Sequence, residues 1–183
     1  MDNGASSYRR FLSGEQSAFD EIMKEYFDSL IFFINRYVRD FHTAEDIAID
    51  CFADLVANKG RYNFKTSLKT YLFMMGRSRA LNFLRRQKII SFVNLSEAEN
   101  IKDSEEGFEE TILKSEQRIQ INNALKSLSK DARIAIHLVY FEDMKYEDAA
   151  RIMKKSPKQI DNLIYRAKKE LRIILGKDGD EPL

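Results

Sequence analysis

A block of thirty residues in the first half of the chain combines positive charge with aromatic rings. Residues 61–90 (RYNFKTSLKTYLFMMGRSRALNFLRRQKII) contain eight Lys or Arg and no acidic residue. The interleaved rings are Tyr62, Phe64, Tyr71, Phe73 and Phe83. Basic side chains bind phosphate and release counterions, and exposed rings stack on unpaired bases. The block therefore predicts a surface for single-stranded nucleic acid. A solvated basic face over rings that belong to the core stays open as the alternative for each ring taken singly.

A second basic block has the spacing of a helix-turn-helix. Residues 146–153 predict a supporting helix, and Ser156 followed by Pro157 predicts the start of a longer one, because serine caps helices and proline suits their first position. Residues 151–177 carry nine basic and two acidic side chains, as a helix that enters a major groove requires. The side chains expected to face outward are Lys158, Gln159, Asp161, Asn162, Tyr165, Arg166 and Lys168. A helical hairpin that only packs is the alternative, since short matches of this kind are common.

Helical periodicity runs through the segments that must position the first block. Apolar residues three and four apart predict one helix over about 15–39 and a second over 43–57. Thr43 and Asp46 have the spacing of a capping box for the second helix. A third helix is expected to begin at residue 66 or 67 and to continue towards Arg86.

In the second half of the chain, the helical pattern returns from Glu116. Ser129 is expected to cap a helix there. The apolar residues that follow, up to and including Phe141, predict a buried core element. No segment keeps the two-residue period of a strand for long, so the expected class is all-α.

The charge changes sign twice along the chain. Residues 1–90 hold 14 Lys and Arg against 11 Asp and Glu, residues 91–115 hold 2 against 7, and the remainder holds 14 against 11. We therefore predict two small helical domains, 1–90 and 116–177, joined by a flexible acidic linker at 91–115 and followed by a polar tail at 178–183.

Several kinds of site and location are excluded by composition. No apolar run approaches the ~20 residues that cross a bilayer, and the first residues lack the apolar stretch of a signal peptide. We expect a cytoplasmic protein without membrane insertion. The single Cys51 forms no internal disulfide. Neither His42 nor His137 has another metal-binding residue type at the sequence spacing of a known metal-binding motif. Packing is the expected role of Cys51, His42 and His137, and neither metal nor cofactor is expected.

The two blocks together resemble the extracytoplasmic-function sigma factors of the sigma-70 family, over about residues 15–90 and 116–175. AFDEIMKEY, AEDIAIDCFADL and TYLFMMGRSRALNFLRR resemble the family's region 2. YFEDMKYEDAA and YRAKKEL resemble the most specific parts of region 4. The resemblance implies a promoter-specificity subunit that binds core RNA polymerase and promoter DNA, assists DNA melting and has no enzymatic activity. It also implies an anti-sigma factor as a partner.

The resemblance assigns roles to particular residues. The helix of 43–57 would dock on the clamp of the polymerase's largest subunit, with Asp46, Asp50 and Asp54 as exposed candidates. Ordinary helix solubility explains these acids equally well. The loop from Asn63 to Lys69 would receive a flipped base of the −10 element, and the following helix would contact the strand and adjoining duplex. The −10 candidates are Asn63, Phe64, Lys65, Lys69, Tyr71, Arg79, Asn82, Arg85 and Arg86. The helix of 157–170 would read the −35 element, with Asp161, Asn162 and Arg166 at the contact positions.

The chain departs from the family's pattern at three places. Lys154 and Lys155 stand where the family usually has Gly and an apolar residue, at a cost of up to ~1 kcal/mol if the backbone is left-handed there. Asp161 replaces a residue that is often basic and can accept from a cytosine amino group. Tyr71 and Phe83 replace the frequent Trp of the −10 helix.

Two other functions are compatible with parts of the sequence. In the first, the N-terminal domain is a sensor and the protein is a conventional repressor or activator, but a sensor has no need of the acid-free aromatic block. In the second, the protein is a helical hydrolase whose acids, such as Glu45, Asp46 and Asp50, bind a metal. Clustered acids are common on helices and no His joins them, which argues against this reading.

Overall fold

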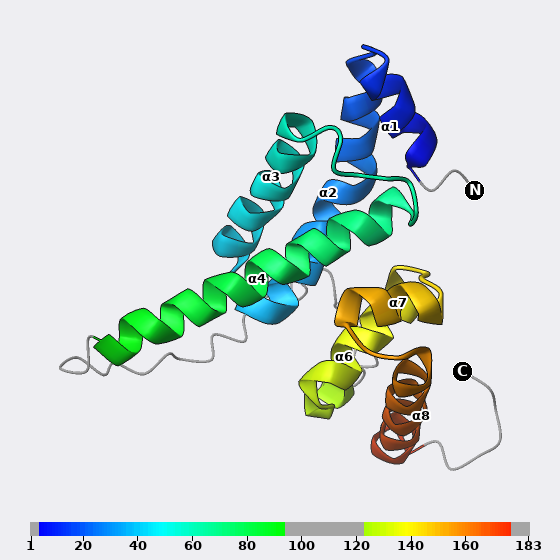
Figure 1. Ribbon diagram of the computed structural model, residues 1–183. Coiled ribbons are helices and arrows are strands. Elements are labelled where there is room, and N and C mark those ends of the chain that lie inside the picture. The colour runs from blue at the N-terminus through cyan, green and yellow to red at the C-terminus, as the bar shows by residue number, and fades with distance from the viewer. Residues whose placement is uncertain (1–3, 94–122, 177–183) are drawn as a thin grey trace, which may run out of the picture. The chain divides into compact units, whose positions relative to one another are not determined.

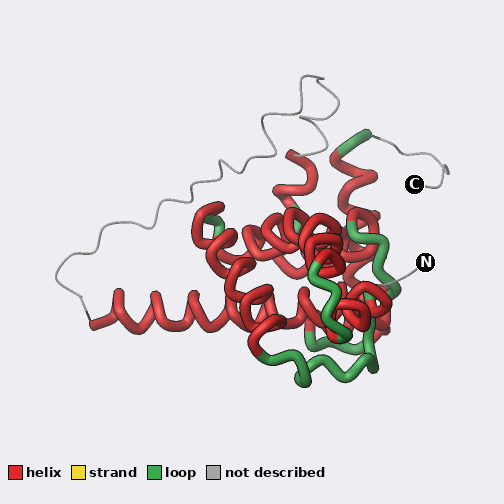
Figure 2. The backbone as a smooth tube through the Cα atoms, turned by 90° about the horizontal axis from the view of Figure 1, so that it is seen from above, coloured by secondary structure: helices red, strands yellow, loops and turns green. Residues whose placement is uncertain are grey.

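The computed structural model describes residues 4–93 and 123–176. They fall into two compact units, one within 4–93 and the other within 123–176 (Figure 1). All regular structure in these residues is helical, with loops between the helices (Figure 2), and none of these helices meets the length and hydropathy that a membrane span requires. The prediction of an all-α protein with two small helical domains is confirmed. The expected linker at 91–115, apart from its first three residues, and the tail at 178–183 lie outside the described residues.

Four helices make up the first unit. They are α1 (Ala5–Leu12), α2 (Ser17–Val38), α3 (Phe41–Ala57) and α4 (Leu68–Val93). α2 packs against the other three (Figure 1). Fully buried side chains at this centre include Leu30, Phe33, Ile34, Leu72 and Phe73. Each such side chain contributes about 1.5–3 kcal/mol on burial, so this apolar centre fixes the position of α4 relative to α2.

The sequence did not predict α1. Its eight residues make about two turns, which is too few for an apolar period to stand out. Tyr8 and Phe11 occupy its inward face and are buried, and the Phe11 ring lies 5.1 Å from that of Phe19 on α2. Tertiary packing therefore holds this short helix, which would be marginal alone.

The predicted capping box of α3 is wrong. The helix begins at Phe41, two residues before Thr43, and the Asp40 side chain accepts a hydrogen bond from Thr43 N at 2.7 Å. Hydrogen bonds from Thr43 hold the pKa of Asp40 below its ordinary value. Arg39, in the left-handed region at φ 59°, ends α2 and leaves Asp40 in the extended conformation of a cap. Thr43 therefore lies inside the first turn of α3.

α4 begins where the sequence predicted and continues farther. Ser67 Oγ accepts a hydrogen bond from Thr70 N at 2.9 Å, and the helix runs to Val93 rather than ending near Arg86. No Gly or Pro after Gly76 interrupts it. Side chains from Arg85 to Ile90 are all exposed, and this part of α4 extends beyond the other helices of its unit (Figure 2). Its second half is therefore held by backbone hydrogen bonds more than by packing.

The second unit is built on a helix-turn-helix. Residues 123–127 are helical and are followed by α6 (Lys130–Ile136), the π-helix η2 (His137–Phe141), α7 (Tyr146–Met153) and α8 (Pro157–Ile174). α6 and α7 both pack on α8. The buried side chains of this unit include Ile134, Leu138, Ile152 and Ile160. These contacts orient α8 and leave its opposite face exposed.

The predicted caps of the second unit are confirmed. Ser129 accepts a hydrogen bond from Ala132 N at 3.3 Å. Ser156 caps α8, with Pro157 in its first turn. Phe141, however, was expected in the core and is 63% exposed. In η2 the Glu142 N–H donates to the His137 carbonyl five residues earlier, at 3.0 Å, and this wider turn changes which side chains face inward.

The turn of the helix-turn-helix carries the backbone strain that its sequence indicated. Lys154 ends α7 at φ 54° and ψ 47°, in the left-handed region. We expect Lys154→Gly to stabilise the protein by up to about 1 kcal/mol, because glycine adopts this conformation without a steric penalty. Lys154→Ala is the matched control, since it removes the same side chain and keeps the Cβ. Thermal denaturation measures both, and an equal shift in Tm for the two variants would contradict the strain.

Cys51 and His137 belong to the cores of their units. Cys51 is fully buried, and burial raises the pKa of its thiol to about 12. His137 is 5% exposed, and its Nε2 lies 3.2 Å from Oε1 of the buried Glu142. The packing roles predicted for both residues agree with these positions. The packing role predicted for His42 is wrong, because His42 is exposed in the first turn of α3. Within the described residues, no group of three or more His, Cys, Asp or Glu side chains could hold a metal ion.

Candidate nucleic-acid interface

An aromatic cluster gives the loop between α3 and α4 a fixed shape. The Tyr62 ring lies 4.6 Å from Phe64 and 5.2 Å from Tyr71, and its hydroxyl donates to the Thr66 carbonyl at 2.6 Å. Phe64 adopts a left-handed backbone at φ 60°, which costs a non-glycine residue about 1–2 kcal/mol. Burial raises the pKa of the Tyr62 and Tyr71 hydroxyls, so they remain protonated donors at neutral pH.

The five rings of the basic block divide between core and surface. Tyr62 and Phe73 are buried, so for these two the packing alternative is correct. Phe64, Tyr71 and Phe83 are half-buried and keep part of their rings accessible. The sequence could not separate the two groups, because all five lie at positions compatible with either face.

Polar groups of the loop lie at its surface. The Asn63 side-chain oxygen accepts a hydrogen bond from Lys65 N at 3.1 Å, which closes a local turn. Asn63 and Lys65 are exposed. Lys69, in the first turn of α4, places its Nζ 5.8 Å from the centre of the Phe73 ring. A half-buried ring, an amide and two ammonium groups therefore lie within seven residues of chain, the combination that binds an unpaired nucleotide.

The candidates on α4 lie one turn apart along the helix. Arg79, Asn82 and Arg86 follow each other at three- and four-residue steps and so share one face. The Asn82 oxygen accepts a hydrogen bond from Arg85 Nη2 at 3.2 Å. Asn82, Arg85 and Arg86 are exposed, while Arg79 is half-buried. Arg86 continues the positive charge of the loop along this face, whereas the charge of Arg79 is paired with acids of α3.

Arg79 also connects α4 to the acidic side of α3. Its Nη2 lies 3.5 Å from Asp54 Oδ2 and its Nη1 lies 3.7 Å from Asp50 Oδ2. Asp54 is further engaged by Asn58 Nδ2 at 2.6 Å and by Arg61 Nη1 at 3.3 Å, and its side chain is only 16% exposed. The expectation of an exposed acid therefore holds for Asp46 and Asp50 and not for Asp54. Sequence reasoning missed this pairing because it joins residues on different helices.

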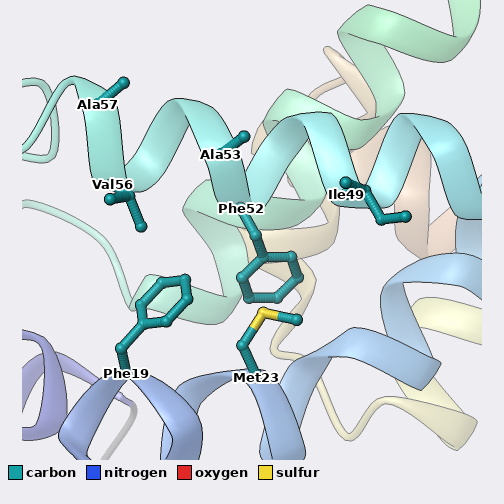
Figure 3. Close-up of a pocket in the computed structure, with 7 residues that line it drawn as sticks. All are labelled: Phe19, Met23, Ile49, Phe52, Ala53, Val56 and Ala57. Atoms are coloured by element: carbon teal, nitrogen blue, oxygen red, sulfur yellow. The ribbon is translucent and has the colours of Figure 1, made fainter. Parts of the chain in front are cut away.

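A shallow apolar groove lies between α2 and α3 (Figure 3). It has a volume of about 420 Å³ and is lined by Phe19, Met23, Ile49, Phe52, Ala53, Val56 and Ala57. Ile49 is 50% exposed and Val56 is 38% exposed. The residues of α3 that line the groove include Ile49 and Ala53, which follow Asp46 and Asp50 by three residues each. Residues three apart on a helix are neighbours, so an apolar stripe runs beside an acidic one. The groove was missed from the sequence, although exposed apolar residues between the acids could have indicated it.

In the second unit, α8 presents most of its predicted side chains to solvent. Lys158, Asp161, Asn162, Tyr165 and Arg166 are exposed, with Tyr165 at 69%. Lys168 is half-buried, and its Nζ lies 4.9 Å from the centre of the Tyr140 ring.

Gln159 is exposed but has a structural role. Its side-chain oxygen accepts a hydrogen bond from Ser156 N at 2.8 Å, which completes a capping box. Because the side-chain oxygen of Gln159 is used in this cap, its side-chain amide nitrogen is the group that can donate to a ligand. The exposed face of α8 therefore offers basic, amide and carboxylate groups in the arrangement of a major-groove reader.

Comparison with known proteins matches both units to one family. Sigma-70 region 2 matches residues 22–89, and Sigma-70, region 4 matches residues 118–171. The RNA polymerase sigma factor YlaC of Bacillus subtilis is 22% identical over 91% of this chain and 96% of its own. The ECF RNA polymerase sigma-E factor of Escherichia coli is 26% identical over 88% of each chain.

A solved structure shares the fold. The sigma factor RpoE of Bartonella quintana, in complex with the anti-sigma factor NepR, gives a TM-score of 0.65 at 24% identity, covering 88% of this chain and 98% of that one. The order of the two matched regions is the one that the sequence motifs predicted. This chain belongs to the sigma-70 family, in its extracytoplasmic-function group.

Proposed function

We propose that this sigma factor binds core RNA polymerase, directs it to specific promoters and assists DNA melting, with a division of labour between its units. Residues 1–90 bind the −10 element, and residues 116–177 bind the −35 element. Residues 91–115 form the linker, and residues 178–183 form the tail. The observation that carries this proposal is the segment 61–90, which contains no acidic residue and in which an ordered aromatic loop leads directly into an exposed basic helix face.

The loop from Asn63 to Lys69 receives one base that has left the stack. Extruding a base costs a few kcal/mol, and stacking on a ring recovers about 1–3 kcal/mol. Phe64 and Tyr71 offer the rings, and Lys65 and Lys69 offer charge for the flanking phosphates. Because the loop is already held by the Tyr62 contacts, little ordering entropy opposes capture, so melting proceeds without nucleotide hydrolysis by the sigma factor.

The exposed face of α4 follows the strand away from the loop. Asn82 contacts a base or the backbone next to the captured one, and Arg85 and Arg86 neutralise phosphates of the adjoining duplex. The hydrogen bond between Asn82 and Arg85 orients both groups towards the same part of the DNA.

α8 reads the −35 element in the major groove. Asn162 and Asp161 are the proposed base readers, since an amide pairs with adenine and a carboxylate accepts from the cytosine amino group. Lys158, Tyr165, Arg166 and Lys168 contact the backbone, and Gln159 contributes its amide nitrogen. The carboxylate of Asp161 weakens the general attraction to phosphate, so the proposed site depends more on sequence than a fully basic helix would.

We expect Arg166→Ala to weaken −35 binding about tenfold and to reduce the salt slope, log K against log[salt], by about 0.9 because one phosphate contact is lost. Titration of −35 duplex at several salt concentrations, with the full chain on core polymerase, measures both quantities. Glu170→Ala, an exposed change one helical turn further along, is the control and should not flatten the slope. An unchanged slope for Arg166→Ala would exclude its phosphate role.

The groove between α2 and α3 is the proposed docking site for polymerase. It combines an apolar floor with the acids Asp46 and Asp50 at its side. A helical partner with apolar side chains and a basic flank fits this pattern, and we assign it to the clamp of the polymerase's largest subunit. Asp54 pairs with Arg79 and Arg61, so its role is to hold α3 in position and not to contact polymerase. An anti-sigma factor that covers the same groove would block polymerase. We place the protein in the cytoplasm, where the polymerase works.

One experiment tests the whole proposal. The purified chain is mixed with sigma-free core polymerase and a genomic library, and transcript starts are mapped. We expect starts at a shared promoter sequence that a reaction without the chain does not produce. If no promoter-specific start appears while a housekeeping sigma factor works under the same conditions, the proposal is wrong.

A further inference from the structure

The base-receiving loop is built on α1, which the sequence left without a role. Tyr8 is fully buried, and its hydroxyl lies 3.1 Å from the carbonyl oxygens of both Leu55 and Lys59, to either of which it can donate. Its ring packs edge-on against Tyr62 at 5.5 Å and lies 6.1 Å from Phe64. α1 therefore fixes the end of α3 and the first half of the loop together.

Arg9, which follows Tyr8 on α1, places its side chain against the loop. Arg9 is exposed, and its Cζ lies 4.8 Å from the centre of the Phe64 ring. A guanidinium stacked on a ring is held in place by the cation–π attraction and still presents its N–H edge to solvent. Arg9 thus adds a positioned positive charge beside the one loop ring that has a left-handed backbone.

Its neighbour Arg10 has a different environment. The Arg10 guanidinium pairs with Glu15 and, at 2.8 Å, with Glu21, so two carboxylates neutralise it. In the described part of the chain, Arg9 has no such acidic partner. Within residues 4–93 and 123–176, Arg9 is therefore the one of these two adjacent arginines whose charge is available to an anion.

We propose that Arg9 is part of the single-strand-binding site, where its guanidinium, stacked on Phe64, binds a phosphate that flanks the base received by the loop. The ligand is a phosphodiester of unpaired DNA. This inference rests on the proposed function of the loop and adds to it a contact from a helix more than fifty residues away in the sequence. The planar guanidinium can donate two parallel hydrogen bonds to one phosphate, which an ammonium group cannot do.

The test compares three variants of the full chain on core polymerase. Arg9→Ala removes charge and stacking, Arg9→Gln removes charge but keeps a planar side chain, and Arg10→Ala removes the same charge from the same helix. The probe is a forked promoter, taken from the mapped starts, whose −10 segment is single-stranded. We expect both Arg9 variants to bind it about three- to tenfold more weakly, with a salt slope smaller by about 0.7, the value for one contact to a single strand.

Arg10→Ala is expected to keep the wild-type affinity and slope, and Tm values establish that all variants are folded. Wild-type slopes for both Arg9 variants would overturn the inference. So would a loss confined to Arg9→Ala, because packing on Phe64 would then be its only role. Asn82→Ala, measured in parallel, separates the two proposals. If it loses strand binding while the Arg9 variants do not, Arg9 is excluded and the loop keeps its proposed function; if Asn82→Ala also binds normally, the proposed function fails.

Discussion

Replacing Ile49 with glutamate is expected to weaken binding of core RNA polymerase by at least about a hundredfold. Ile49 is 50% exposed and lines the groove between α2 and α3, where a docked helix would remove it from water. A buried interface residue of this size is worth about 2 kcal/mol or more, and an unpaired carboxylate in its place adds a desolvation cost. Titration of labelled polymerase with the full chain, without DNA, measures the change.

Ile89→Glu is the matched control for this change. Ile89 is exposed to a similar extent, 58%, but lies on the second half of α4, away from the groove. It introduces the same charge on a helix of the same unit and should leave polymerase binding within about twofold, as surface substitutions usually do. Equal losses for the two variants would mean that added negative charge, and not the groove, decides binding.

Replacing Asn82 with alanine is expected to reduce open-complex formation about tenfold or more and to leave core binding unchanged. The exposed amide lies on the side of α4 that we propose to face the strand, and it orients Arg85 by accepting its hydrogen bond. Loss of a base or backbone contact of this kind costs about 1–3 kcal/mol. Permanganate reactivity of unpaired thymines at a mapped promoter measures opening, and the same preparation is titrated with polymerase alone.

Gln87→Ala provides the control for Asn82. It removes an exposed amide from the same helix five residues further on, which places it on a different face. We expect opening to remain near the wild-type level. If Asn82→Ala lowered core binding and opening by the same factor, the residue would have no specific role in melting.

Local signals in the sequence were sufficient for most helix boundaries and for the family. Ser129 and Ser156 cap helices as their positions predicted, because a cap depends on residues three positions apart. Ser67 was predicted only as one of two possible starts of its helix, and it caps α4. The strain at Lys154 was likewise a local property of the turn. The capping of α3 was misassigned because Asp40 and Thr43 are both good caps, and the conformation of Arg39 decided between them.

Features that depend on contacts between helices could not be predicted. The groove needs α2 beside α3, the Asp54–Arg79 pair needs α3 beside α4, and the position of Arg9 over Phe64 needs α1 at the loop. The exposure of Phe141 follows from a π-turn that no residue pattern marked. These parts of the proposed site are therefore set by tertiary packing, even though the residue types that form them were visible in the sequence.

Because α4 is uninterrupted, the distance between its first residues and Arg86 is fixed. From Leu68 to Arg86 the helix rises by about 27 Å at 1.5 Å per residue. That is close to the axial extent of eight stacked base pairs at about 3.4 Å each. In the proposed complex, a rod of this length would act as a ruler between the captured base and the duplex contacted by Arg86. A template with one base pair more or fewer between these points would have to stretch or twist to reach both.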